Sequence, residues 1–206
     1  MKSALLLMIV TFPVMAAGPS TITLPKPETT GGKPLMQALA ARASSREFSQ
    51  RKLASQVLSN LLWAAFGINR PDGRRTAPSA MNRQTIDVYA VLPEGVYLYE
   101  PKPHRLRQIN PTDARARTGT HGFVAEAALD LVYVADFAKM GGEPENDKLL
   151  FAGAETGFIG QNVYLFCASE GMATVIRASI DRTTLAKALK LRPDQKITLS
   201  QTVGYR

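Results

Sequence analysis

Two arginines and a serine alternate at Arg42, Ser44 and Arg46. A guanidinium group matches two oxygens of a phosphate at once, and a hydroxyl group adds one further donor. The segment therefore indicates a phosphate site. The same spacing also occurs on solvated surfaces where the side chains bind nothing, so both interpretations stay open for this segment on its own.

A second polar segment, Pro78-Ser79-Ala80-Met81-Asn82, precedes a predicted strand. An asparagine in a loop often satisfies nearby backbone groups, which would be a purely structural role. Its amide and the neighbouring backbone N–H groups are also suited to the hydrogen-bonding edge of a planar ring. Further along, Gly171 and Met172 follow a long predicted helix, and glycine is a common residue at a helix end.

The elements that must position these residues can be predicted from apolar periodicity. Helices are expected over residues 35–41, 53–66, 148–170 and 182–189. Strands are expected over residues 85–92, 96–100, 128–135, 173–178 and 197–203. Pro93-Glu94-Gly95 makes the first two strands a hairpin. Because strands and helices intermix without a regular βαβ period, the fold class is expected to be α+β.

One face of the longest predicted helix is rich in small residues. The residues on this face are Gly153, Gly157, Gly160, Tyr164, Cys167 and Gly171. A glycine inside a helix costs about 1 kcal/mol relative to alanine, so a compensating close approach is expected. The approaching element could belong to the same chain or to a second copy. Cys167 is expected to be a packed thiol, since no basic residue near it in sequence would activate it.

Four segments, in their order and spacing, resemble the nitroreductase family of FMN-dependent oxidoreductases: Arg42–Phe48, Ala77–Gln84, Thr156–Asn162 and Gly171–Thr174. The resemblance runs from about residue 35 to the C-terminus. Gly95–Tyr99 and Gln161–Leu165 are most similar to the branch that includes azoline-oxidising peptide dehydrogenases. The resemblance implies a central, mostly antiparallel sheet flanked by helices, and an intertwined homodimer built around a long central helix.

The resemblance also implies a site for FMN. Family members hold the FMN phosphate and ribityl chain with the first segment, and the matching asparagine contacts the flavin ring, often from the other subunit. The cofactor-binding residues implied are Arg42, Ala43, Ser44, Arg46, Pro78, Ser79, Ala80, Asn82, Gly171, Met172 and Arg206. Many members carry a basic residue or histidine where this chain has Ala43, and Arg206 or Arg177 could supply that charge.

The activity implied is a ping-pong reduction of a small organic acceptor, such as a nitroaromatic or a quinone. A donor reduces the flavin and leaves, and the acceptor then enters the vacated pocket. No side chain is expected to be catalytic, because the flavin carries the electron or hydride transfer. The alternative is a non-catalytic flavin- or anion-binding module on the same fold, an interpretation favoured by Ala43 and by the end of the chain at Tyr205-Arg206.

Residues 1–17 have the features of a secretory signal peptide. A basic start is followed by an apolar run from Ala4 to Met15 and by small residues, which allow cleavage after Ala16 or Ala17. The run is shorter than the roughly 20 residues of a membrane span, so stable membrane insertion is not expected, with an uncleaved anchor as the alternative. The mature protein is therefore expected to be periplasmic or secreted.

Residues 18–34 contain four prolines and three glycines, which favours an extended arm. In a dimer this arm could lie over the partner, or it could be a plain linker. Residues 35–206 are then expected to form one nitroreductase-like domain.

Charge and composition narrow the possible partners. The formal net charge is +8, but no Lys/Arg-rich run is interleaved with aromatic residues, so nucleic acid is not expected. His104 and His121 are isolated, so no metal site is expected. The electron donor is expected to be NAD(P)H or a periplasmic or membrane carrier. Because export separates the protein from cytoplasmic NAD(P)H, we hypothesise that the carrier is the physiological donor.

Overall fold

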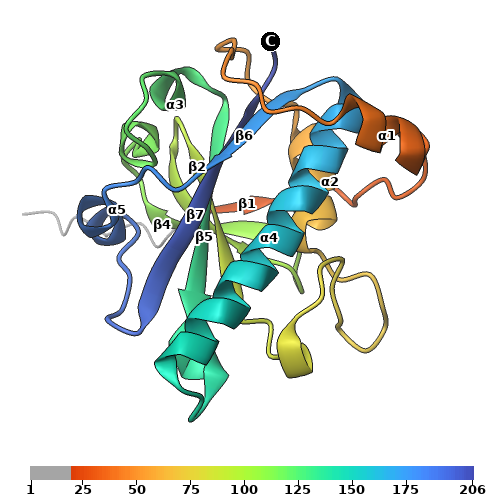
Figure 1. The fold of residues 1–206 in the computed structure, drawn as a ribbon. Coiled ribbons are helices and arrows are strands. Elements are labelled where there is room, and N and C mark those ends of the chain that lie inside the picture. Colours follow the sequence, from red (N-terminus) through yellow and green to blue (C-terminus); the bar gives the residue numbers. More distant parts are fainter. Residues whose placement is uncertain (1–19) are drawn as a thin grey trace, which may run out of the picture.

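The computed structural model describes residues 20–206 (Figure 1), so the predicted signal peptide lies outside the described residues. The helices are α1 (Leu35–Ala41), α2 (Ser55–Phe66), α3 (Phe123–Glu126), α4 (Glu145–Glu170) and α5 (Arg182–Ala188). The strands are β1 (Thr21–Thr23), β2 (Ile86–Leu92), β3 (Gly95–Glu100), β4 (Arg105–Asn110), β5 (Leu129–Asp136), β6 (Ala173–Arg177) and β7 (Gln195–Gly204). Short 3-10 turns lie at Ala80–Asn82, Arg115–Arg117 and Phe137–Met140.

The strands form one antiparallel sheet in the order β1-β4-β3-β2-β5-β7-β6. One face packs against α2 and α4, and the other packs against α5. In Figure 1, α4 runs diagonally in front of the sheet and α5 lies at the left of the view. The expected α+β fold, with a central antiparallel sheet flanked by helices, is confirmed.

Strand β5 shows why the sheet has a core on both faces. All of its residues are buried. Leu131 and Tyr133 belong to the α2/α4 core, whereas Val132 and Val134 belong to the α5 core. Because successive side chains of a strand point to opposite faces, an unbroken apolar run is what a strand covered on both sides requires.

Strand β4 is absent from the sequence-based prediction. Leu106 is its one fully buried side chain, and charged residues stand on either side of it. Arg105 and Arg107 are held by Glu100 of β3, at 2.6 and 2.7 Å. Pairing with β3, rather than an apolar pattern, therefore makes this segment a strand.

The arm packs along its own chain. β1 pairs with β4 at the sheet edge, and Leu24 is buried. Beyond it, the Glu28 N–H donates to Asn60 Oδ1 on α2 at 2.9 Å, and the Lys33 N–H donates to Ser169 Oγ on α4 at 2.7 Å. The arm thus runs from the sheet edge to the C-terminal end of α4. Within residues 20–206, no helix combines the length and apolar character needed to cross a membrane.

Candidate functional site

The C-terminal end of α4 is the first part of the site. Gly171 ends this 26-residue helix in the left-handed conformation, with φ 69°, and the Met172 N–H donates to the carbonyl oxygen of Cys167 at 2.8 Å. Gly171 is therefore the helix stop that the sequence predicted. Cys167 is fully buried, and burial raises the pKa of its thiol, as expected for a packed cysteine.

The segment carrying Arg42, Ser44 and Arg46 lies against the free edge of β6. The Ser45 N–H donates to the carbonyl oxygen of Thr174 at 2.9 Å. Ser44 Oγ lies 2.8 Å from the hydroxyl of Tyr164 on α4, and that hydroxyl also accepts the Ile176 N–H at 3.0 Å. Tertiary contacts thus bring the predicted phosphate segment next to the Gly171–Met172 turn.

Three predicted cofactor residues at this end carry guanidinium groups that have no carboxylate partner. Arg42, Arg46 and Arg206 are exposed, and none forms an ion pair within residues 20–206. The chain end reaches this region because the Ser49 N–H donates to the carbonyl oxygen of Tyr205 at 2.8 Å. Uncompensated guanidinium groups beside a serine hydroxyl fit the charge and donor needs of a phosphate. Ala43 is exposed and adds no charge.

Arg177 does not supply the missing charge, so this part of the prediction is wrong. Its guanidinium is buried and forms an ion pair with Asp130 at 2.9 Å, while Nη1 donates to the carbonyl oxygen of Thr118. Burial raises the pKa of Asp130 to about 7, against the hydrogen bond from Thr202 and the charge of Arg177. Because this ion pair is buried, the Arg177 guanidinium is not available to a phosphate at the surface.

The Pro78–Asn82 loop lies elsewhere, bound to a buried carboxylate of α4. Glu155 Oε1 accepts the Ser79 hydroxyl at 2.9 Å and the Ala80 N–H at 3.0 Å. Glu155 Oε2 accepts the Thr85 hydroxyl at 2.6 Å, and Glu155 is only 2% exposed. One side chain therefore fixes both ends of the loop that contains Asn82.

The backbone of this loop is strained. Met81, Asn82 and Gln84 have φ angles of 51°, 54° and 50°, in the left-handed region. This region costs most residues about 1–2 kcal/mol but is tolerated by glycine and asparagine, so the strain lies at Met81 and Gln84. Conformations of this kind persist where surrounding contacts impose them, and they concentrate at functional sites.

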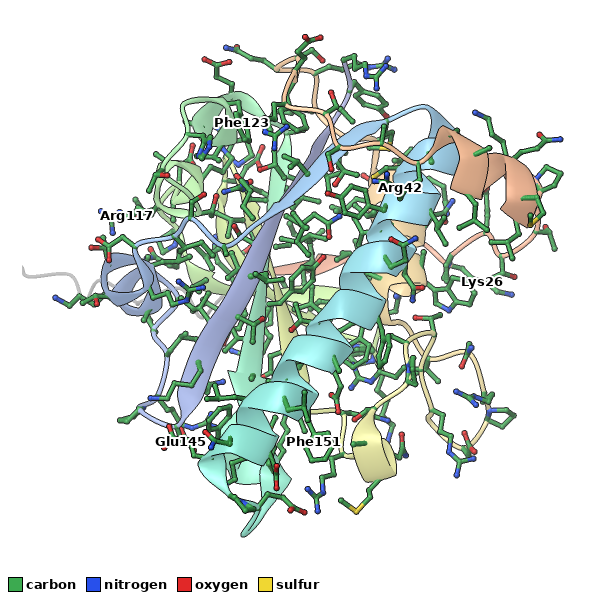
Figure 2. The ribbon with its side chains drawn as sticks, in the orientation of Figure 1. Lys26, Arg42, Arg117, Phe123, Glu145 and Phe151 are labelled. Atoms are coloured by element: carbon green, nitrogen blue, oxygen red, sulfur yellow. The ribbon has the colours of Figure 1, made fainter. Side chains whose placement is uncertain are left out.

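The two groups of predicted residues lie far apart along α4. Residues 155 and 171 differ by 16 positions, which corresponds to about 24 Å of helix. Figure 2 shows Arg42 near one end of α4 and Glu145 at the other. The structure therefore gathers Arg42, Ser44, Arg46, Gly171, Met172 and Arg206 at the C-terminal end, and places Pro78, Ser79, Ala80 and Asn82 toward the N-terminal half.

The glycine-rich face of α4 is divided between two environments. A Cβ atom added at Gly160 would lie 2.6 Å from Ile176 Cδ1, so this glycine permits packing within the chain. A Cβ added at Gly153 or Gly157 would meet nothing within 4 Å. Beside these open glycines, Leu150 and Phe158 are 67% and 46% exposed. The N-terminal half of α4 thus presents an apolar surface that residues 20–206 do not cover.

A cavity of about 610 Å³ lies between the arm, α2 and α4, and no predicted cofactor residue lines it. Its wall includes Glu28, Lys33, Trp63, Asn162, Phe166 and Glu170. We assign the candidate site to the polar groups around Gly171 rather than to this cavity, because the unpaired guanidinium groups lie there. Within residues 20–206, no three His, Cys, Asp or Glu side chains lie close enough to hold a metal ion.

Sequence reasoning missed Glu155 and Tyr164 as site residues. Glu155 occupies the buried stripe of α4 together with Ala152 and Ile159. A carboxylate on an apolar stripe must be satisfied by hydrogen bonds, and that signal could have identified Glu155. The role of Tyr164 has no comparable signal, because its partners come from the segments at Ser44 and Ile176.

Comparison with known proteins places this geometry in context. The profile described as the nitroreductase family matches residues 39–205. A protein of Methanocaldococcus jannaschii, provisionally named a nitroreductase, is 27% identical over 168 residues, which cover 77% of this chain and 85% of that protein. The crystal structure of a provisionally named nitroreductase from Ralstonia eutropha JMP134 is 45% identical, with a TM-score of 0.86, and the match covers 90% of this chain and 89% of that one.

Two more distant structures share the fold. The microcin synthetase McbBCD complex of Escherichia coli contains a chain with a TM-score of 0.69 and 20% identity, and the match covers 86% of this chain and 76% of that one. The NADPH:FMN oxidoreductase of Vibrio harveyi, solved with NAD+, has a TM-score of 0.62 and 17% identity, with coverage of 83% and 68%.

Proposed function

This chain belongs to the nitroreductase family, and from that premise we propose that it is an exported, FMN-dependent oxidoreductase that acts as a homodimer. Its acceptor is a small organic molecule of the nitroaromatic or quinone type, reduced in a ping-pong cycle. The observation that carries the proposal is the separation of the two groups of predicted cofactor residues along α4.

A second copy of the chain brings the two groups of residues together. The open face at Gly153 and Gly157 allows the α4 helices of two protomers to pack against each other in opposite directions. The C-terminal end of one helix then lies beside the N-terminal half of the other. The Asn82 loop of one protomer then faces the Arg42–Arg46 segment of its partner. Each dimer holds two complete sites, whereas one protomer holds two half-sites.

The exposed apolar side chains agree with this arrangement. On α1, beside the C-terminal end of α4, Leu35 and Met36 are 62% and 75% exposed. On the N-terminal half of α4, Leu149 and Leu150 are 53% and 67% exposed. An antiparallel crossing buries the first pair against the second in both copies. Clustered apolar exposure of this kind marks protein interfaces.

Each half of the site has its own role. Arg42, Arg46 and Arg206 bind the phosphate of FMN, and Ser44 adds a hydroxyl. The backbone beside Gly171 and the Asn82 amide of the partner hydrogen-bond the ring. Bound FMN supplies the electron or hydride transfer, so no side chain is required as a general acid.

The donor follows from the predicted signal peptide. An exported protein does not meet the cytoplasmic NAD(P)H pool, so we propose a periplasmic or membrane electron carrier as the physiological donor. Rapid turnover of the purified holoprotein with NADH at a low Michaelis constant would contradict this part of the proposal and favour NAD(P)H.

The first experiment is a visible absorption spectrum of the protein purified from its exported fraction, with and without added FMN. We expect a flavin spectrum that dithionite bleaches and that a nitroaromatic or a quinone restores. A colourless protein that does not bind FMN would remove the flavin proposal. A bound flavin that dithionite reduces but no acceptor reoxidises would support the alternative, a non-catalytic binding module.

A further inference from the structure

We infer that Glu155 is a positioning residue for the cofactor site of the partner protomer: its buried carboxylate holds the Asn82 loop in the conformation that contacts the flavin ring. The inference rests on the proposed function and goes further, because it assigns each site a requirement for a buried group that does not touch the cofactor.

The first support is the way in which the carboxylate is satisfied. Glu155 is almost fully buried, and no Lys, Arg or His nitrogen within residues 20–206 forms an ion pair with it. A buried carboxylate without a cation requires hydrogen bonds to its oxygens. The donors here are Ser79, Ala80 and Thr85, which all belong to the loop or to its junction with β2.

The second support is a hydrogen-bond relay that leads to Asn82. The Ser79 hydroxyl donates to Glu155 and accepts the Gln84 N–H at 2.7 Å. Gln84 Nε2 in turn donates to Asn82 Oδ1 at 3.1 Å. The Asn82 NH2 group contacts no acceptor within residues 20–206 and can donate outward. The carboxylate thus sets the direction of the amide through two intervening residues.

The third support is the strained backbone of the same loop. Met81, Asn82 and Gln84 are all in the left-handed region, which asparagine tolerates but methionine and glutamine avoid. Contacts that hold both ends of the loop are needed to keep Met81 and Gln84 in place. When the carboxylate is removed, we expect the loop to relax and the Asn82 amide to turn away from the ring.

The test compares Glu155→Ala and Glu155→Gln with Glu145→Ala, a matched control that removes an exposed carboxylate from the first turn of the same helix. FMN and riboflavin, which lacks the phosphate, are titrated by fluorescence. In Glu155→Ala the loop loses two hydrogen bonds to a charged acceptor, and a tenfold change in affinity corresponds to about 1.4 kcal/mol. The substitution should therefore lower the affinity for both FMN and riboflavin at least about tenfold.

The ratio of the two affinities distinguishes positioning of the ring from binding of the phosphate. Glu155→Ala should leave the FMN-to-riboflavin preference unchanged, whereas Arg42→Ala with Arg46→Ala should reduce that preference, because two of the three guanidinium groups assigned to the phosphate are lost. Glu155→Gln retains the Oε1 acceptor for Ser79 and Ala80 and should recover most of the affinity. Equal flavin affinity in Glu155→Ala and Glu145→Ala would overturn the inference.

A heterodimer shows which protomer the loop serves. Two differently tagged chains, one with Glu155→Ala and one with Arg42→Ala plus Arg46→Ala, are co-expressed and the mixed dimer is purified. If the loop completes the partner's site, one of the two sites contains only unchanged residues, and the dimer regains one flavin. If the loop serves its own chain, both sites are damaged and no flavin is regained, which contradicts the inference.

The outcomes also separate this inference from the proposed function. A wild-type protein that binds no flavin removes both. A wild-type protein that binds flavin, together with a Glu155→Ala variant that binds it equally well, removes only the role of Glu155. If Glu155→Ala does not fold, Thr85→Val removes just the donor to Oε2. That variant should lose part of the flavin affinity, and an unchanged affinity would count against the proposed role of Glu155 in holding the loop.

Discussion

The hydroxyl of Tyr164 lies 2.8 Å from Ser44 Oγ and also accepts the Ile176 N–H. This contact joins three parts of the chain that are remote in sequence: the phosphate segment, the long helix and the edge strand β6. It places Ser44 and its neighbouring arginines at the end of α4, where Gly171 turns the chain into β6. The proposed phosphate half of the site therefore depends on Tyr164, which is not among the predicted cofactor-binding residues.

Tyr164→Phe should loosen the phosphate segment. The substitution removes the partner of Ser44 and leaves the Ile176 N–H without its acceptor, which should lower the free energy of unfolding by about 1–3 kcal/mol. FMN affinity should fall more than riboflavin affinity. Urea unfolding and flavin titration measure the two effects. Tyr205→Phe is the control, since the Tyr205 hydroxyl makes no hydrogen bond within residues 20–206 and both quantities should remain unchanged.

Arg42→Ala combined with Arg46→Ala should weaken FMN retention, because two unpaired guanidinium groups are lost from the phosphate half of the site. The dependence of FMN affinity on salt concentration should also decrease, since screening acts on these charges. Lys187→Ala combined with Lys196→Ala removes the same charge from exposed positions outside the phosphate segment. Equal flavin content in the two double variants would show that the phosphate site is misassigned.

Gly157→Arg should separate folding from assembly. A Cβ atom added at this exposed position meets nothing within 4 Å in the protomer, and an arginine can extend from it into solvent, so the fold and its thermal stability should persist. In a dimer crossing at this face, the same side chain prevents close approach of the helices. Light scattering should therefore report a monomer, and flavin binding should be lost. Gly142→Arg, also in open space, is the control and should remain dimeric. A flavin-binding Gly157→Arg dimer would exclude this face as the interface.

The arm should loosen as the pH falls. His104 Nε2 lies 2.7 Å from Ser59 Oγ, Nδ1 lies 3.0 Å from the Tyr99 hydroxyl, and Ser59 donates to the carbonyl oxygen of Pro25 in the arm. Burial lowers the pKa of His104. The folded protein therefore binds fewer protons than the unfolded chain, and this stabilisation is present above the ordinary histidine pKa of about 6.5 and is lost as the pH falls below it.

Hydrogen exchange or limited proteolysis of residues 20–34 at pH 7.5 and pH 5 measures this effect. Protection of the arm should decrease at the lower pH in the wild-type protein. His104→Gln removes the titrating group, so its arm should show weaker protection that no longer changes between the two pH values. The same pH dependence in wild type and variant would assign the effect to another group.

Much of the fold could be predicted from local signals. Alternating and continuous apolar runs identify β2, β3 and β5, and the stripe at Leu58, Leu61 and Leu62 identifies α2, because each element must bury one or two faces. Gly171 is recognisable as a helix end, because few other residues adopt positive φ without strain. β4 could not be predicted in this way, because its charged residues pair with a residue of the neighbouring strand and form no apolar pattern along the sequence.

The order of the polar segments in the sequence determined the family and the list of candidate cofactor residues, since each segment carries its donors locally. Tertiary structure alone decided which candidates lie together. In the folded protein Arg177 pairs with Asp130, and Ser44 contacts Tyr164. The Asn82 loop binds Glu155, which lies far from Gly171 along α4. The physical reason is that a buried polar group takes whichever partner packing brings near. Local sequence can mark such a group as buried, as at Glu155, but it does not identify the partner.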